Sequence, residues 1–95
     1  MSNFCSDKYS GHFLRPGEVD KKLFHLLIDI SSVRSEHVIR ALEAFFVMGH
    51  ERRLICDEGN ISPGYLSVKI RELRALSQKI SAIHLHYQQL LTDKV

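Results

Sequence analysis

The fold is decided by the stretch Arg53–Leu73, which reads RLICDEGNISPGYLSVKIREL. Gly59 and Asn60, near its centre, tolerate left-handed backbone geometry, so we expect a helix to end there. Ser62 is typical of a helix N-cap, and Pro63 of the first helical position, where its missing N–H costs no hydrogen bond. The stretch therefore predicts a short helix, a turn and a second helix.

The spacing within this stretch fits a helix-turn-helix over about residues 50–74. Such a motif needs a small residue where the second helix crosses the first, and Cys56 occupies that place. Asn60, four positions later, accepts a positive φ, and Ile61 is placed to fill the corner between the helices. Leu66 and Ile70 follow at helical spacing, so we expect both to be buried.

The outer face of the second helix carries short side chains, which would let that helix lie deep in the major groove of DNA. These residues are Ser62, Gly64, Ser67, Val68 and Arg71. The cations around them are placed to contact phosphates and to set the register on the duplex. They are Arg52, Arg53, Lys69 and Arg74. An ordinary helical hairpin is the alternative, because two helices joined by a Gly-Asn turn are common.

The string Ile61–Ser67, ISPGYLS, favours DNA binding over that alternative. It is similar to the opening of the recognition helix in many bacterial regulators, including the arabinose-regulator family. Tyr65 lies within it and joins the expected DNA-binding residues.

Composition and charge agree with a small globular protein. The chain has 95 residues, 44% of them apolar and 25% charged, which fits one domain. The net charge is only +2, but its distribution is uneven. Residues 1–47 carry six Lys/Arg and six Asp/Glu, whereas residues 60–80 carry four Lys/Arg and one Asp/Glu. The excess of positive charge therefore falls on the predicted second helix, where a nucleic-acid-binding protein needs it.

The rest of the chain also predicts helices, so we expect an all-α fold. Residues 1–15 lack any period and are interpreted as a flexible arm, and residues 16–95 as a single helical domain. Three helical segments with inward-facing apolar residues precede the long one. The first spans 19–30, and its apolar residues are Val19, Leu23, Leu26, Leu27 and Ile30. The second begins after the N-cap Ser35 and ends before Gly49, and its apolar residues are Val38, Ala41, Leu42, Phe45 and Met48. The third spans 51–58 and contains Leu54 and Ile55.

The last helix is expected to run from Pro63 to about Leu91 without interruption. Its apolar residues recur at alternating spacings of three and four, which is a heptad pattern. They are Leu73, Leu76, Ile80, Ile83, Tyr87 and Leu90. The stripe either folds back on the protein's own core or forms an oligomerisation seam. We favour a seam through Leu76, Ile80, Ile83, Tyr87 and Leu90, because so short a domain gains stability by self-association.

Several function classes are disfavoured. The two cysteines, Cys5 and Cys56, do not make a disulfide framework, which indicates reduced thiols in the cytoplasm. There is no signal peptide and no apolar run that could span a bilayer, so no membrane partner is expected. His84 and His86 lie on different faces of a helix and cannot share a metal. No catalytic set, phosphate loop, cofactor motif or small-molecule site is apparent, so we expect a protein that is not an enzyme.

Three blocks of sequence, in combination, resemble the adhesin-biosynthesis regulators typified by PapB. They are FHLLIDISS (24–32), GHxRxxxC (49–56) and GYxS (64–67), and the match runs from about Leu23 to Ser77. The resemblance implies a cytoplasmic bacterial transcription factor that controls an adhesin or fimbrial operon and binds AT-rich double-stranded DNA as an oligomer. It also implies that Arg52 and Cys56 bear on DNA binding. The competing hypothesis is a helical protein–protein interaction module that never binds DNA.

Overall fold

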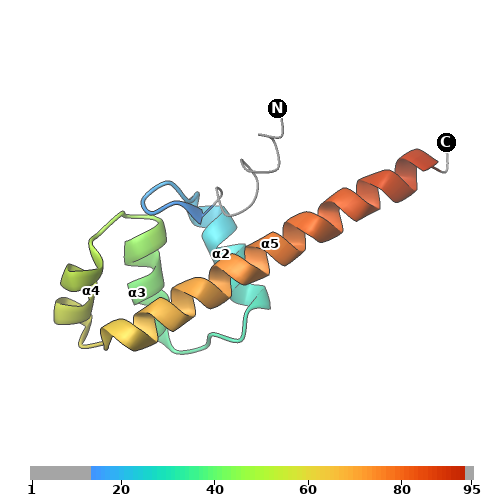
Figure 1. Cartoon of the computed structure of the whole chain (residues 1–95). Coiled ribbons are helices and arrows are strands. Elements are labelled where there is room, and N and C mark those ends of the chain that lie inside the picture. Colours follow the sequence, from blue (N-terminus) through green and yellow to red (C-terminus); the bar gives the residue numbers. More distant parts are fainter. Residues whose placement is uncertain (1–13, 94–95) are drawn as a thin grey trace.

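The computed structural model describes residues 14–93, and the regular structure within them is helical (Figure 1). The elements are α2 (Lys21–Ile30), α3 (Glu36–Phe46), α4 (Arg52–Gly59) and α5 (Pro63–Asp93). No strand occurs in this part of the chain. The predicted all-α fold with a long C-terminal helix is confirmed.

The helices form a small body from which half of α5 projects (Figure 1). Helices α3, α4 and α5 pack against one another in pairs, and α2 lies against α3 and α5. Because α5 has 31 residues, it is about 46 Å long, whereas α3 has 11 residues. Its C-terminal half therefore extends beyond the body that the shorter helices can cover. No helix among residues 14–93 combines the length and the apolar character needed to cross a bilayer.

The helix starts follow from local side-chain chemistry. Ser35 Oγ accepts a hydrogen bond from the Val38 N–H at 3.4 Å, as predicted for this N-cap. The first helix begins later than expected, because the Asp20 carboxylate accepts the Leu23 N–H at 3.0 Å and caps α2 at that point. Val19 is buried but precedes the helix.

The core is one continuous apolar cluster to which every described helix contributes. Its largest fully buried side chains come from the segment before α2 and from α2, α3 and α5. They are Phe24, Phe46, Leu14, Leu42, Leu66 and Ile70. The core therefore reaches the N-terminal half of α5 and holds the candidate recognition helix against the body.

The expected inward face of α2 was only partly right. Leu27 is buried as predicted, but Leu23, Leu26 and Ile30 are exposed. Phe24 and Ile28, which the predicted stripe omitted, are buried instead. The apolar arc of α2 is wider than the surface that α3 and α5 cover, and the packing selects the half of the arc that contains Phe24 and Ile28.

Two further inward-facing predictions were wrong. Met48 is 59% exposed, because α3 ends at Phe46 and Met48 lies in the turn that follows. Phe46 is fully buried. Leu54 is also exposed, since α4 has only eight residues and the structure buries Ile55 alone among them.

A close approach of two glycines fastens the N-terminal segment to the end of α3. Gly17 and Gly49 have φ values of 75° and 77°, in the left-handed region. A Cβ on Gly17 would lie 3.0 Å from Gly49 Cα. The Gly17 N–H donates to the Phe45 carbonyl at 3.1 Å. Leu14, which was assigned to the flexible arm, is fully buried at this end of the core. The rest of the arm up to residue 13, Cys5 included, lies outside the described residues.

Candidate nucleic-acid interface

The turn between α4 and α5 has the geometry of a helix-turn-helix corner. Asn60 adopts φ 52° and ψ 50°, the left-handed conformation. The backbone N–H groups of Asn60 and Ile61 both donate to the Cys56 carbonyl, the latter at 3.2 Å. Ile61 is buried in the corner, and Ser62 Oγ accepts the Tyr65 N–H at 3.1 Å, which caps α5.

The residues of the predicted motif core lie as its spacing required. Leu66 and Ile70 are buried between α5 and the body. Cys56 is half-buried, packs against the core and is a free thiol. A small side chain at this place lets α4 and α5 approach each other.

The opposite face of α5 is open to solvent. Gly64 has no heavy atom within 4 Å of a built Cβ, and Tyr65 and Val68 are large side chains that remain exposed. Ser62 and Arg71 are exposed, whereas Ser67 is half-buried. The first two turns of α5 therefore expose Ser62, Gly64, Tyr65 and Val68, whereas Ser67 is partly covered.

Arg52 spans from α4 to this face. Its Nη1 donates to Ser67 Oγ at 2.9 Å, and its Cζ lies 5.2 Å from the centroid of the Phe45 ring. Arg53, beside it, is exposed. Arg52 therefore links α4 to the candidate recognition helix, and its positive charge lies where the two helices meet.

Lys69 lies in a different environment. Its Nζ is 3.2 Å from a Glu72 carboxylate oxygen and 5.4 Å from the Tyr65 ring centroid. The Glu72 carboxylate offsets much of the charge that Lys69 could offer to a phosphate.

Arg74 is held inside the molecule more firmly than a flanking surface cation would be. Its Nη2 donates to the Leu14 carbonyl at 3.3 Å, and its Cζ lies 5.9 Å and 5.7 Å from the Phe45 and Phe46 ring centroids. Burial lowers the pKa of Arg74, and the nearby Arg52 charge lowers it further. Sequence reasoning missed these aromatic and carbonyl partners, because α3 and the segment before α2, both distant in the sequence, supply them.

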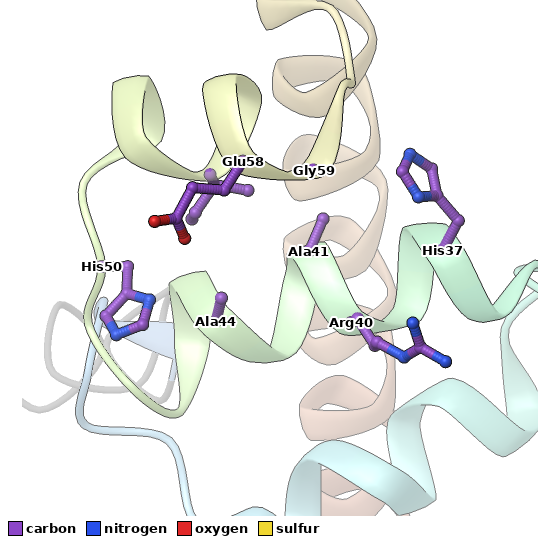
Figure 2. Close-up of a pocket in the computed structure, with 8 residues that line it drawn as sticks. His37, Arg40, Ala41, Ala44, His50, Glu58 and Gly59 are labelled. Atoms are coloured by element: carbon purple, nitrogen blue, oxygen red, sulfur yellow. The ribbon is translucent and has the colours of Figure 1, made fainter.

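A cleft of about 290 Å³ separates α3 from α4 (Figure 2). Small residues form part of its wall, among them Ala41, Ala44 and Gly59. His50 and Glu58 line one end, and His37 and Arg40 line the other (Figure 2). These four charged or titratable residues are exposed, so the cleft places no buried polar group toward a ligand.

The predicted oligomerisation stripe divides into two parts. Leu76 and Ile80 are half-buried and pack against the protein's own core. Ile83, Tyr87 and Leu90 are 49%, 62% and 45% exposed on the projecting half of α5. Leu76 and Ile80 therefore already have partners within the same chain, and the seam through all five residues stays a prediction. No group of three potential metal ligands occurs within residues 14–93.

Comparison with known proteins decides the family. Residues 1–87 match the PapB family, described as adhesin biosynthesis transcription regulatory proteins. The chain belongs to this family. It is 61% identical to the regulatory protein FanB of Escherichia coli over 67 residues, which cover 70% of this chain and 68% of FanB. It is 40% identical to the AFA-III adhesin operon regulatory protein of the same species, over 70% of this chain and 66% of that protein.

A solved structure of the same fold is that of FocB from E. coli. It superposes with a TM-score of 0.73 at 28% identity and covers 90% of this chain and 93% of FocB. The PapB-family resemblance of the sequence is confirmed, and the chain is a transcription regulatory protein of adhesin operons rather than an enzyme.

Proposed function

We propose that this PapB-family regulator controls its adhesin operon by binding AT-rich double-stranded DNA through α4 and α5. The observation that carries the proposal is the exposed, small-residue face of the first turns of α5, beside a left-handed Asn60 corner. A recognition helix contacts base edges with its N-terminal residues. Ser62, Gly64 and Val68 leave room for that approach, and Arg71 is placed to reach a base edge. The site of action would then be the bacterial cytoplasm, where the operon lies.

The phosphate contacts are expected to come from α4 and from the flank of α5. Arg52 contacts Ser67 on α5 and Arg53 is exposed beside it in α4, while the Lys69 charge is partly offset by Glu72. Phosphate contacts set the register of the protein on the duplex but do not read the sequence. We therefore assign Arg71 to base contact and the α4 arginines to backbone contact.

Duplex binding as a function of salt tests this function. Fluorescence anisotropy would compare an AT-rich duplex with a GC-rich duplex of the same length between about 50 and 200 mM salt. We expect tighter binding to the AT-rich duplex, with log K falling linearly with log salt as counterions are released. Equal or absent binding to both duplexes, without that dependence, would contradict DNA reading and favour the helical interaction module.

The projecting half of α5 is proposed to bind a second copy of the chain. Ile83, Tyr87 and Leu90 follow one another at spacings of four and three, so they lie on one face of the helix. Leu91, one turn after Tyr87, extends the same exposed apolar surface. Self-association removes this surface from water and places two DNA-binding faces in one particle, which raises their effective concentration on neighbouring sites.

A further inference from the structure

Two arginine side chains from different helices converge on one aromatic ring. Arg52 at the start of α4 and Arg74 in α5 have their Cζ atoms 5.2 Å and 5.9 Å from the centroid of Phe45, which α3 supplies. Ser67 and Arg74 are seven residues apart, two helical turns, and so share one face of α5. Because Arg52 donates to Ser67 Oγ, both guanidinium groups lie along that one face.

The protein partners of these two arginines are neutral. Arg52 bonds to a hydroxyl, Arg74 bonds to the Leu14 carbonyl, and within residues 14–93 neither forms an ion pair with a carboxylate. Both Cζ atoms lie within 5.9 Å of the same ring centroid, and burial together with the Arg52 charge lowers the pKa of Arg74. Two like charges held close together with neutral partners create a local positive potential that an anion would offset.

The chemistry of the groups suits a phosphate. A guanidinium held over an aromatic ring can still donate its N–H groups to an anion beside the ring. Each guanidinium carries five N–H donors, and the described contacts of Arg52 use one of them. Arginine binds phosphate through paired N–H groups, and its charged hydrogen bonds are stronger than neutral ones.

We propose that Arg52 and Arg74 together hold one phosphate of the DNA backbone at the edge of the helix-turn-helix, and that Phe45 is the positioning residue for both. The proposal rests on the DNA-binding function proposed above. The proposed site differs from a set of independent surface cations, because the contribution of each arginine to DNA binding depends on the other arginine and on the buried Phe45 ring.

Substitution of the two arginines tests the shared phosphate. Arg52→Gln and Arg74→Gln are each expected to weaken binding to the AT-rich duplex on the order of tenfold, and to reduce the salt slope by about one. The double variant should lose less than the product of the two single losses, because both lose the same contact. Arg52→Lys and Arg74→Lys keep the charge but lose the planar stacked group, and we expect them to remain weakened several-fold.

Substitution of Phe45 tests the positioning role, with Phe24 as the matched control. Both rings are buried in the same core, but Phe24 contacts His25 and neither arginine. Phe45→Leu and Phe24→Leu should lower the melting temperature by similar amounts. Only Phe45→Leu should weaken DNA binding at a temperature where both are folded, and Arg52→Gln should then cost little more in that background.

The outcomes separate this site from the function on which it rests. A parent protein without salt-dependent duplex binding overturns the DNA-binding function itself. If the parent binds normally while Arg74→Gln and Phe45→Leu bind as tightly as the parent, the shared site is wrong and Arg74 is only structural. Strictly multiplicative losses in the double variant also overturn it. If Phe45→Leu does not fold, the two lysine variants decide: binding equal to the parent excludes the stacked geometry.

Discussion

At the scale of single residues, the cations around α5 have different partners and so different capacities to bind DNA. Arg71 is exposed, Lys69 is paired with Glu72, and the Arg74 guanidinium lies within 5.9 Å of the centroids of two aromatic rings. The sequence placed Arg71 on the outer face of the helix and treated Lys69 and Arg74 alike, as flanking cations. Their contacts indicate that removing each one will have a distinct effect.

Arg71→Ala is expected to relax sequence preference, at a cost of about 1–3 kcal/mol for the preferred duplex if the side chain contacts a base edge. Lys69→Ala should weaken binding to all duplexes alike and lower the salt slope by no more than about one, since Glu72 already offsets its charge. Binding of both variants to preferred and scrambled duplexes of equal length measures the difference. Equal, sequence-independent losses would remove Arg71 from base contact.

Cys56→Ser is expected to act on stability. Cys56 lies in α4, is half-buried and packs against the core. We expect the substitution to lower the free energy of unfolding by about 1 kcal/mol or more. This is toward the low end of the range for a buried polar group, because the hydroxyl can donate a hydrogen bond to a backbone carbonyl of its own helix. Urea unfolding measures the loss, with Cys56→Ala as the control. A large fall in DNA affinity in fully folded protein would instead show that the thiol itself takes part in binding.

At the scale of elements, the turns determine the arrangement of the helices as much as helix packing does. The corner after α4 depends on Asn60 in the left-handed region, and the turn after α3 depends on Gly49 against Gly17. The second contact joins segments 32 residues apart in the sequence, and it places the N-terminal segment beside Phe45. These turns set the direction in which α4 leaves α3, and hence where Arg52 lies.

Gly49→Ala is expected to destabilise the fold by about 1–2 kcal/mol or more, because an L side chain is strained at this φ. Its Cβ would also lie 3.1 Å from Gly17 Cα, a backbone atom that cannot move aside alone. Gly64→Ala is the control: its Cβ meets nothing within 4 Å, and it should stabilise α5 by up to about 1 kcal/mol. Thermal unfolding of both variants checks the opposite signs, and a neutral Gly49→Ala would contradict the close approach.

At the scale of the whole molecule, the long helix has two distinct environments. Its first half completes the core, and its second half exposes an apolar face beyond the body (Figure 1). A charged side chain introduced at an apolar position of either half would lose its hydration when that position is covered, which costs free energy. A charge on the first half opposes folding, whereas a charge on the second half opposes association.

Ile83→Glu is expected to give a folded monomer where the parent sediments as a larger species. The new carboxylates would be desolvated and brought close together across a two-fold axis. Leu76→Glu is the contrasting variant, because Leu76 packs against the core and its charge should unfold the chain. Sedimentation and circular dichroism distinguish the two effects. A parent that remains monomeric at high micromolar concentration would contradict the proposed self-association.

Features that depend on neighbouring residues could be predicted from the sequence. Ser35 and Ser62 at helix starts, Asn60 in a left-handed turn and the buried spacing of Leu66 and Ile70 all depend on residues within a few positions of one another. The all-α fold and the helix-turn-helix spacing followed from these signals, whereas the family followed from the resemblance of three sequence blocks to its members.

The tertiary structure alone decided which apolar faces are covered and which side chains meet. The amphipathic arc of α2 and the stripe of α5 are both wider or longer than their contacts, so neighbouring helices select Phe24 over Leu23 and Ile80 over Ile83 for burial. The meeting of Arg52 and Arg74 on Phe45 joins three helices, and no spacing along the chain encodes it. Burial and long-range contact depend on the mutual placement of elements, which a local pattern does not contain.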